Sequence, residues 1–138
     1  MSTGKNKWIE AVGRLLQLTQ NRELIWRTLD PPPDLNGHPE DKRVDVVYET
    51  QYGDRTLRLY ELKFKVESPH PFIRVASVFD LREFPYWTEK ATLELLDQKG
   101  LSAWKFPDMD VIDHLLTAVR YQVVGVKEFL DEILVAAG

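Results

Sequence analysis

Three residues within the stretch 43–65 combine types and spacing that could carry out chemistry. Asp45 lies in the first half of this stretch, and Glu61 and Lys63 lie two residues apart in the second half. Residues two apart in a strand point to the same face of a sheet, so Glu61 and Lys63 share one side. Carboxylate oxygens suit a hard divalent cation such as Mg²⁺, and a neighbouring lysine can orient a nucleophile. The stretch therefore contains one candidate arrangement for metal-assisted hydrolysis.

The pattern Asp45…Glu61-x-Lys63 resembles the core motif of the PD-(D/E)xK nucleases. The resemblance implies that Asp45 and Glu61 bind Mg²⁺ and that Lys63 acts on the attacking water. It also implies that Glu10, on a preceding helix, could add a carboxylate. The pattern departs from the family in the context of its first acidic residue and in lacking a clear helix after Lys63. An ordinary cross-strand ion pair accounts for the same residues, and it is our leading interpretation.

Composition limits the classes of protein to which the chain could belong. Its 138 residues suit a single domain over 1–138, and a hydrophobic content of 43% is typical of a folded protein. The formal net charge is −4, without the basic bias of extended nucleic-acid binders, so nucleic acid is not the expected partner. The chain has no cysteine, which excludes disulfides and thiolate metal sites.

The distribution of apolar residues predicts a cytoplasmic protein. The first ten residues, MSTGKNKWIE, contain no apolar run of the kind found in secretory signals. No stretch approaches the roughly 18–20 apolar residues that a membrane-spanning helix requires. We therefore expect no membrane contact.

Hydrophobic periodicity predicts the elements that position these residues. Apolar spacing predicts a helix over 5–20, and further helices from Asp110 to a break at Gly125 and from there to the C-terminus. The apolar faces of the two C-terminal helices comprise Ile112, Leu115, Leu116 and Val119, then Val126, Phe129, Leu130, Ile133 and Leu134. Strands are expected over 23–29, 43–51, 55–66, 86–97 and 101–106. Residues 72–80 fit either a strand or a partly helical loop.

The order of these elements predicts the fold class. Strands clustered between terminal helices favour an α+β fold with a mainly antiparallel sheet of about five strands. The two C-terminal helices are expected to pack on one face of the sheet. Gly53-Asp54 predicts a tight turn between the central strands. Alternation of side chains along the predicted strand 43–51 places Val44 on the same face as Tyr48.

Other residues offer weaker candidate sites. Asp110, Asp113 and His114 could form a metal site, but a solvated helix face explains them better. Tyr86 and Trp87 are adjacent in an expected strand, so they point to opposite faces, and one of them is a candidate binding anchor. No nucleophile elbow, phosphate-binding loop or dinucleotide fingerprint is present. An apolar pocket between the sheet and the C-terminal helices remains an open alternative.

Three segments of the chain resemble a family of short bacterial proteins of unknown function. These segments are LLQLTQNRELIWRTLDPP, RVDVVYETQYGDRTLRLYE and FPDMDVIDHLLTAVRYQVVGVKEFLDEIL. The resemblance implies a small bacterial cytoplasmic single-domain protein and indicates no particular activity. From the acidic charge, the candidate exposed aromatic residues and the lack of a convincing catalytic set, we expect a non-enzymatic, adaptor-like, immunity-like or chaperone-like module without a cofactor. Its expected partner is another protein bound by a sheet face or edge, and such an edge could also pair two copies.

Overall fold

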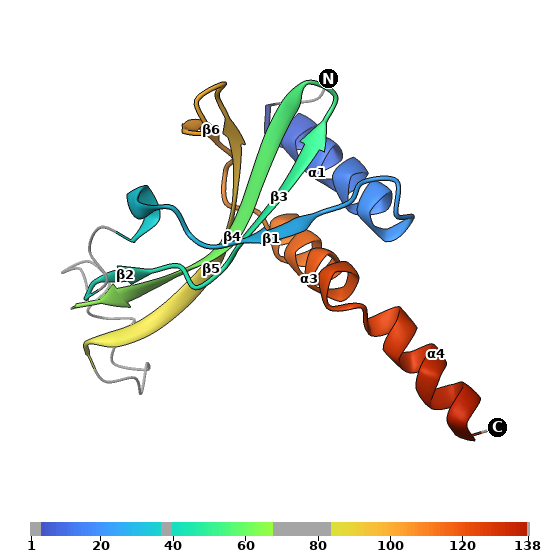
Figure 1. Cartoon of the computed structure of the whole chain (residues 1–138). Helices are drawn as coiled ribbons and strands as arrows, with labels where there is room; N and C mark the ends of the chain where they lie inside the picture. Colours follow the sequence, from blue (N-terminus) through green and yellow to red (C-terminus); the bar gives the residue numbers. More distant parts are fainter. Residues whose placement is uncertain (1–3, 37–39, 68–83, 138) are drawn as a thin grey trace.

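The computed structural model describes residues 4–36, 40–67 and 84–137 (Figure 1). The elements in chain order are α1 (Gly4–Gln20), β1 (Arg27–Leu29), the 3₁₀ turn η1 (Pro33–Leu35), β2 (Lys42–Arg43), β3 (Val47–Tyr52), β4 (Arg55–Val66), β5 (Tyr86–Leu96), β6 (Ser102–Lys105), α3 (Asp110–Val124) and α4 (Val126–Ala137). This arrangement confirms the expected α+β fold. The candidate strand or loop at 72–80 lies outside the described residues. No helix in the described part of the chain is long and apolar enough to cross a bilayer.

The sheet is built around β4. Its strands run in the order β1-β3-β4-β5-β6, β2 pairs separately with β4, and every pair is antiparallel. The predicted hairpin turn is confirmed, because Tyr52 pairs with Arg55 and Gly53 has a φ of 63°. Glycine adopts this left-handed conformation without the steric penalty of a side chain.

The predicted strand 43–51 is interrupted. Residues 44–46 leave the ladder between β2 and β3, so the alternation does not continue through them. The prediction that Val44 and Tyr48 lie on the same face is therefore wrong. Val44 packs with Val47 and Tyr60, whereas Tyr48 belongs to the core beneath the helices. Asp45 lies within this irregular segment.

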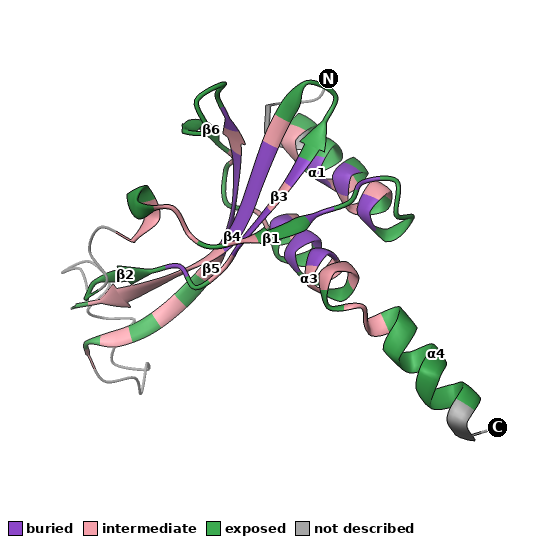
Figure 2. Ribbon diagram, viewed as in Figure 1, coloured by how far each residue is buried: buried purple, intermediate pink, exposed green. Residues whose placement is uncertain are grey.

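Helices α1 and α3 cover one face of the sheet (Figure 1), and the main core lies between them and the strands. Figure 2 shows buried residues along the middle of the sheet and on the inner sides of both helices. The predicted apolar face of α3 is buried, and it comprises Ile112, Leu115, Leu116 and Val119. On the predicted first helix, Val12 and Leu15 are buried at a spacing of three residues, so they share one face.

One polar side chain joins the end of α1 to the end of α3. Gln122 of α3 donates hydrogen bonds from Nε2 to the carbonyl oxygens of Thr19 and Leu24, at 3.1 and 2.9 Å. Its Oε1 accepts a hydrogen bond from the backbone nitrogen of Trp26 at 2.8 Å. The Trp26 indole nitrogen in turn donates to the Thr19 hydroxyl at 2.9 Å. These bonds satisfy backbone groups at the turn that leads from α1 into β1.

A buried ionic network occupies the opposite face of the sheet. The Arg58 and Glu94 side chains are 3% and 2% exposed, and Arg58 Nη2 lies 2.9 Å from Glu94 Oε2. Tyr60 donates a hydrogen bond to the same carboxylate, and Asp34 of η1 lies 3.4 Å from Arg58. Burial raises the pKa of Glu94, but hydrogen bonds from Ser102, Tyr60 and the arginine, together with the arginine's charge, hold it below its usual range.

The two C-terminal helices differ in how far they are covered. Asp110 is the first residue of α3, and Met109 holds the N-cap position without a side-chain bond. The predicted break is confirmed at Gly125, which ends α3 in the left-handed conformation with a φ of 78°. Beyond it α4 leads away from the sheet (Figures 1 and 2), and its predicted apolar face remains largely exposed.

The buried network makes Arg58→Met strongly destabilising. Removing the arginine leaves the Glu94 carboxylate buried without its positive partner, which typically costs about 3–5 kcal/mol of the free energy of unfolding. Urea denaturation of the variant measures this loss. The matched control Arg55→Met, at an exposed position of the same strand, should change stability by less than about 0.5 kcal/mol. Similar small losses in both variants would contradict the network's role.

Candidate functional site

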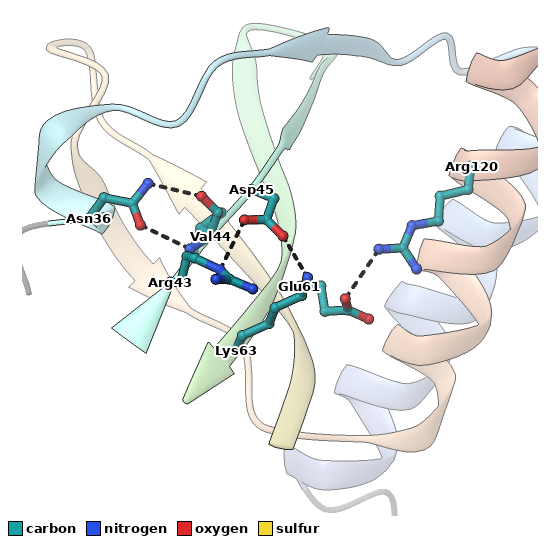
Figure 3. A network of polar contacts seen from close by, with 7 residues as sticks. All are labelled: Asn36, Arg43, Val44, Asp45, Glu61, Lys63 and Arg120. Carbon is teal, nitrogen blue, oxygen red and sulfur yellow. Dashed lines mark hydrogen bonds and ion pairs between the residues drawn. The ribbon is translucent and has the colours of Figure 1, made fainter. Parts of the chain in front are cut away.

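Asn36 fixes the backbone beside Asp45. Its side-chain Nδ2 donates a hydrogen bond to the Val44 carbonyl oxygen, and its Oδ1 accepts one from the Val44 nitrogen, both at 2.9 Å (Figure 3). The two bonds replace the ladder contacts that the segment between β2 and β3 lacks. Asp45 is thus held in place although it does not belong to a strand.

Each carboxylate oxygen of Asp45 forms an ion pair with a basic side chain. Lys63 Nζ lies 2.5 Å from Oδ2, and Arg43 Nε lies 3.2 Å from Oδ1 (Figure 3). The hydrogen bond from Lys63, aided by the charges of both cations, outweighs burial and lowers the pKa of Asp45 below its usual range. Asp45 is about half exposed, so the solvent screens this pairing, which contributes little to stability.

Glu61 lies on the helix-covered side of β4 and faces α3. Its Oε1 lies 3.6 Å from Arg120 Nη2, which links the strand to the helix (Figure 3). Arg120 also forms a side-chain hydrogen bond with Tyr48 of β3. A hollow of about 210 Å³ is lined by Asp45, Val46, Glu61, Lys63 and Arg120. The structure therefore brings the three predicted residues Asp45, Glu61 and Lys63 to one place.

The charges at this hollow are already paired. Arg43 and Lys63 compensate Asp45, and Arg120 compensates Glu61. A Mg²⁺ ion would have to displace these cations to reach the two carboxylates. Glu10, the proposed further carboxylate, lies exposed on α1 and does not line the hollow. Within residues 4–36, 40–67 and 84–137, no group of three or more acidic or histidine side chains is placed to hold a metal. The donor set therefore does not fit a metal centre in this arrangement.

Sequence reasoning missed three residues at this site. Asn36 stands eight residues before Val44 and Arg120 lies far along the chain, and no sequence pattern indicates that Asn36 bonds to Val44 or that Arg120 pairs with Glu61. Arg43 stands two residues before Asp45, and that spacing alone would have suggested it as an ion-pair partner. Arg120 directly follows buried Val119 on α3, so its place at the edge of the apolar stripe was the only available signal.

The other predicted residues lie away from this hollow. Trp87 is 47% exposed and Tyr86 is partly buried, as expected for neighbours on opposite sides of a strand. The Arg43 guanidinium lies 5.8 Å from the Trp87 ring centroid, which covers part of the indole. His114 is exposed on α3 and lines a different hollow, of about 690 Å³, between α1 and α3. This larger hollow also reaches Lys127 at the base of α4.

No family model, no curated protein and no solved structure matches this chain. The resemblance to short bacterial proteins therefore stays a prediction. Function has to be argued from the surfaces and side chains of the molecule itself.

The pairing of Asp45 predicts a measurable change in its pKa. In Lys63→Met the pKa of the Asp45 carboxyl should rise toward its ordinary value, since the largest lowering influence is lost. Titration followed by NMR of the side-chain carboxyl measures this change. In the control Lys65→Met the pKa of Asp45 should stay unchanged, because Lys65 lies near Glu67 instead. Equal values in the wild type and Lys63→Met would show that the pair is absent in solution.

Proposed function

We propose that this protein is a non-enzymatic interaction module that binds a protein surface through α4. The observation that carries the proposal is the uncovered apolar face of this helix. Phe129 is 60% exposed and Leu134 is 69% exposed, and Leu130 and Ile133 between them are also exposed. Helical spacing places these four side chains on one face. Exposed contiguous apolar surface of this kind typically marks a contact with another macromolecule.

The energetics of α4 support the same proposal. Burying one large aliphatic or aromatic side chain contributes about 1.5–3 kcal/mol, so covering four of them provides substantial binding free energy. An isolated helix as short as the 12 residues of α4 is marginal in water. Its described polar links to the rest of the fold are few, chiefly the Arg22–Glu128 ion pair at 2.5 Å. A partner laid on the apolar face would therefore both bind the helix and stabilise it.

The surface most suited to binding differs from the sheet face or edge that we expected from the sequence. Five of the thirteen exposed large apolar side chains belong to α4, which makes it the densest such region in the described part of the chain. Trp87 is a second, isolated anchor on the sheet. Whether the role is adaptor-like, immunity-like or chaperone-like follows from what α4 binds.

Capture experiments with three forms of the protein test this proposal. The immobilised wild-type chain should retain a stoichiometric protein partner from a lysate of its native host. Ile133→Asp should lose that partner, because it puts a charge in the middle of the apolar face. Val135→Asp should retain it, since Val135 is also exposed but lies two residues away, on the opposite side of the helix. Equal retention by both variants, or no partner for the wild type, would contradict the proposal.

The hollow at Asp45 supports a second candidate function, that of a nuclease. The supporting observation is the shared location of Asp45, Glu61 and Lys63, the three residues of the resembled motif. Because both carboxylates are paired with protein cations, this candidate requires that Arg43, Lys63 and Arg120 release Asp45 and Glu61 to a metal. Its test is cleavage of DNA or RNA that depends on added Mg²⁺ or Mn²⁺ and is lost in Lys63→Ala. Lys65→Ala, a change on the same strand outside the hollow, would leave cleavage unchanged. Absence of metal-dependent cleavage by the wild type, or equal cleavage by Lys63→Ala, would eliminate this candidate.

A further inference from the structure

We infer that a hollow on the face of the sheet opposite the helices binds a primary ammonium group with a neighbouring carbonyl oxygen. The first residue of a peptide carries this pair of groups, and so do small amino amides. The inference goes beyond the proposed function and does not involve α4. It follows from a buried donor atom at the hollow and from two carboxylates at its rim, all of which the fold leaves available.

The hollow lies between two connections of the chain. Asp30 and Pro32, which follow β1, line one side of it, and Asp97 and Gly100, which follow β5, line the other. Arg58 also lines the hollow, from the central strand β4. The volume is about 280 Å³, just below the range of roughly 300–1,000 Å³ that is typical of ligand pockets. The hollow therefore suits a small group rather than a large apolar ligand.

Arg58 carries a donor that the fold does not use. Its side chain is only 3% exposed, and its ion pairs with Glu94 and Asp34 are both made by Nη2. The Nε atom is buried and has no hydrogen-bond partner in the described part of the chain. Buried donors in folded proteins almost always have an acceptor, because an unmet one is costly. A ligand oxygen that enters the hollow beside Arg58 can supply that acceptor.

Two carboxylates at the rim of the hollow are available to a cation. Asp30 is exposed, and its carboxylate forms no ion pair or hydrogen bond with the described residues. Asp97 is exposed as well, and its Oδ1 accepts hydrogen bonds from two backbone nitrogens of its own turn at 2.8 and 3.0 Å, which leaves Oδ2 available. Glu49 also lines the hollow but is already paired with Arg27. The two uncompensated charges attract a cation to this rim.

These groups together specify the chemical class of the ligand. The two carboxylates favour an ammonium group, whereas Nε of Arg58 requires an acceptor oxygen. That oxygen should be neutral, because Glu94 already balances the charge of Arg58. A second anion would also be repelled by Asp30 and Asp97. A carbonyl oxygen next to an ammonium group meets both conditions.

NMR of the full chain tests the inference at the donor atom itself. The Nε–H group of Arg58 has its own resonance, and glycinamide, which carries both required groups, should shift that resonance saturably. At a pH of about 6 the amine of glycinamide is protonated. Methylamine lacks the oxygen and N-acetylglycinamide lacks the ammonium group, so each should bind at least about tenfold more weakly. No saturable shift with glycinamide, or equal binding of the three compounds, overturns the inference.

Substitutions at the rim locate the ammonium group. Asp30→Asn and Asp97→Asn remove the two charges but keep an oxygen at each position, so the hydrogen bonds of the turn at Asp97 can persist. The double variant should bind glycinamide at least about tenfold more weakly. Glu132→Gln removes an exposed charge outside the hollow and should leave binding unchanged. Circular dichroism confirms that each variant is folded, and equal binding by the wild type and the double variant overturns the inference.

A peptide distinguishes the two sources of the ligand. A tripeptide of glycine and alanine with a free N-terminus carries the same ammonium and carbonyl groups as glycinamide. Tighter binding of the tripeptide identifies the ligand as a peptide N-terminus, whereas equal or weaker binding identifies it as a small amino amide. The N-acetylated tripeptide should bind at least about tenfold more weakly than the free one. Equal binding of these two forms of a tripeptide that occupies the hollow overturns the inference.

Discussion

Alternation along β4 is the constraint on which the other features of the molecule depend. This strand pairs with β2, β3 and β5, and it sends successive side chains to opposite faces of the sheet. On the helix side it contributes Leu57 and Leu59 to the core and Glu61 and Lys63 to the hollow. On the other side it contributes Arg58 to the buried network. A shift of its pairing by one residue would exchange these two sets, so the register of β4 fixes both the core and the site.

The buried network makes that register costly to change. Arg58 on β4 and Glu94 on β5 stand directly opposite each other in the ladder, and both are almost fully buried. A shift of pairing would leave each charge without its partner in a region of low polarity. An apolar pair of similar volume would tolerate the same shift more easily. The ion pair therefore contributes specificity of strand pairing, a role that does not depend on its net contribution to stability.

Sequence reasoning succeeded where the pattern within one segment determines its structure, and failed where the structure depends on contacts between segments. The bounds of β4, the turn at Gly53 and the buried faces of α1 and α3 follow from periodicity and turn chemistry. The break at 44–46 does not, because it depends on Asn36 supplying hydrogen bonds from another segment. The meeting of Arg120 with Glu61 likewise depends on how α3 packs. The apolar face of α4 was predicted correctly, but hydrophobic spacing does not indicate whether other parts of the same chain cover that face.

Gln122 has a consequence for α4 that goes beyond the backbone groups it satisfies. Its three hydrogen bonds fasten the last turn of α3 to the end of α1 and to the entry of β1. One residue, Gly125, then separates this anchored turn from α4. The base of the exposed helix is thus tied to the sheet rather than joined to it by a long flexible linker. Because the fold already fixes the orientation of α4, less orientational entropy is lost when the helix binds. Its association should therefore be faster and tighter than that of a peptide of the same sequence on a flexible tether.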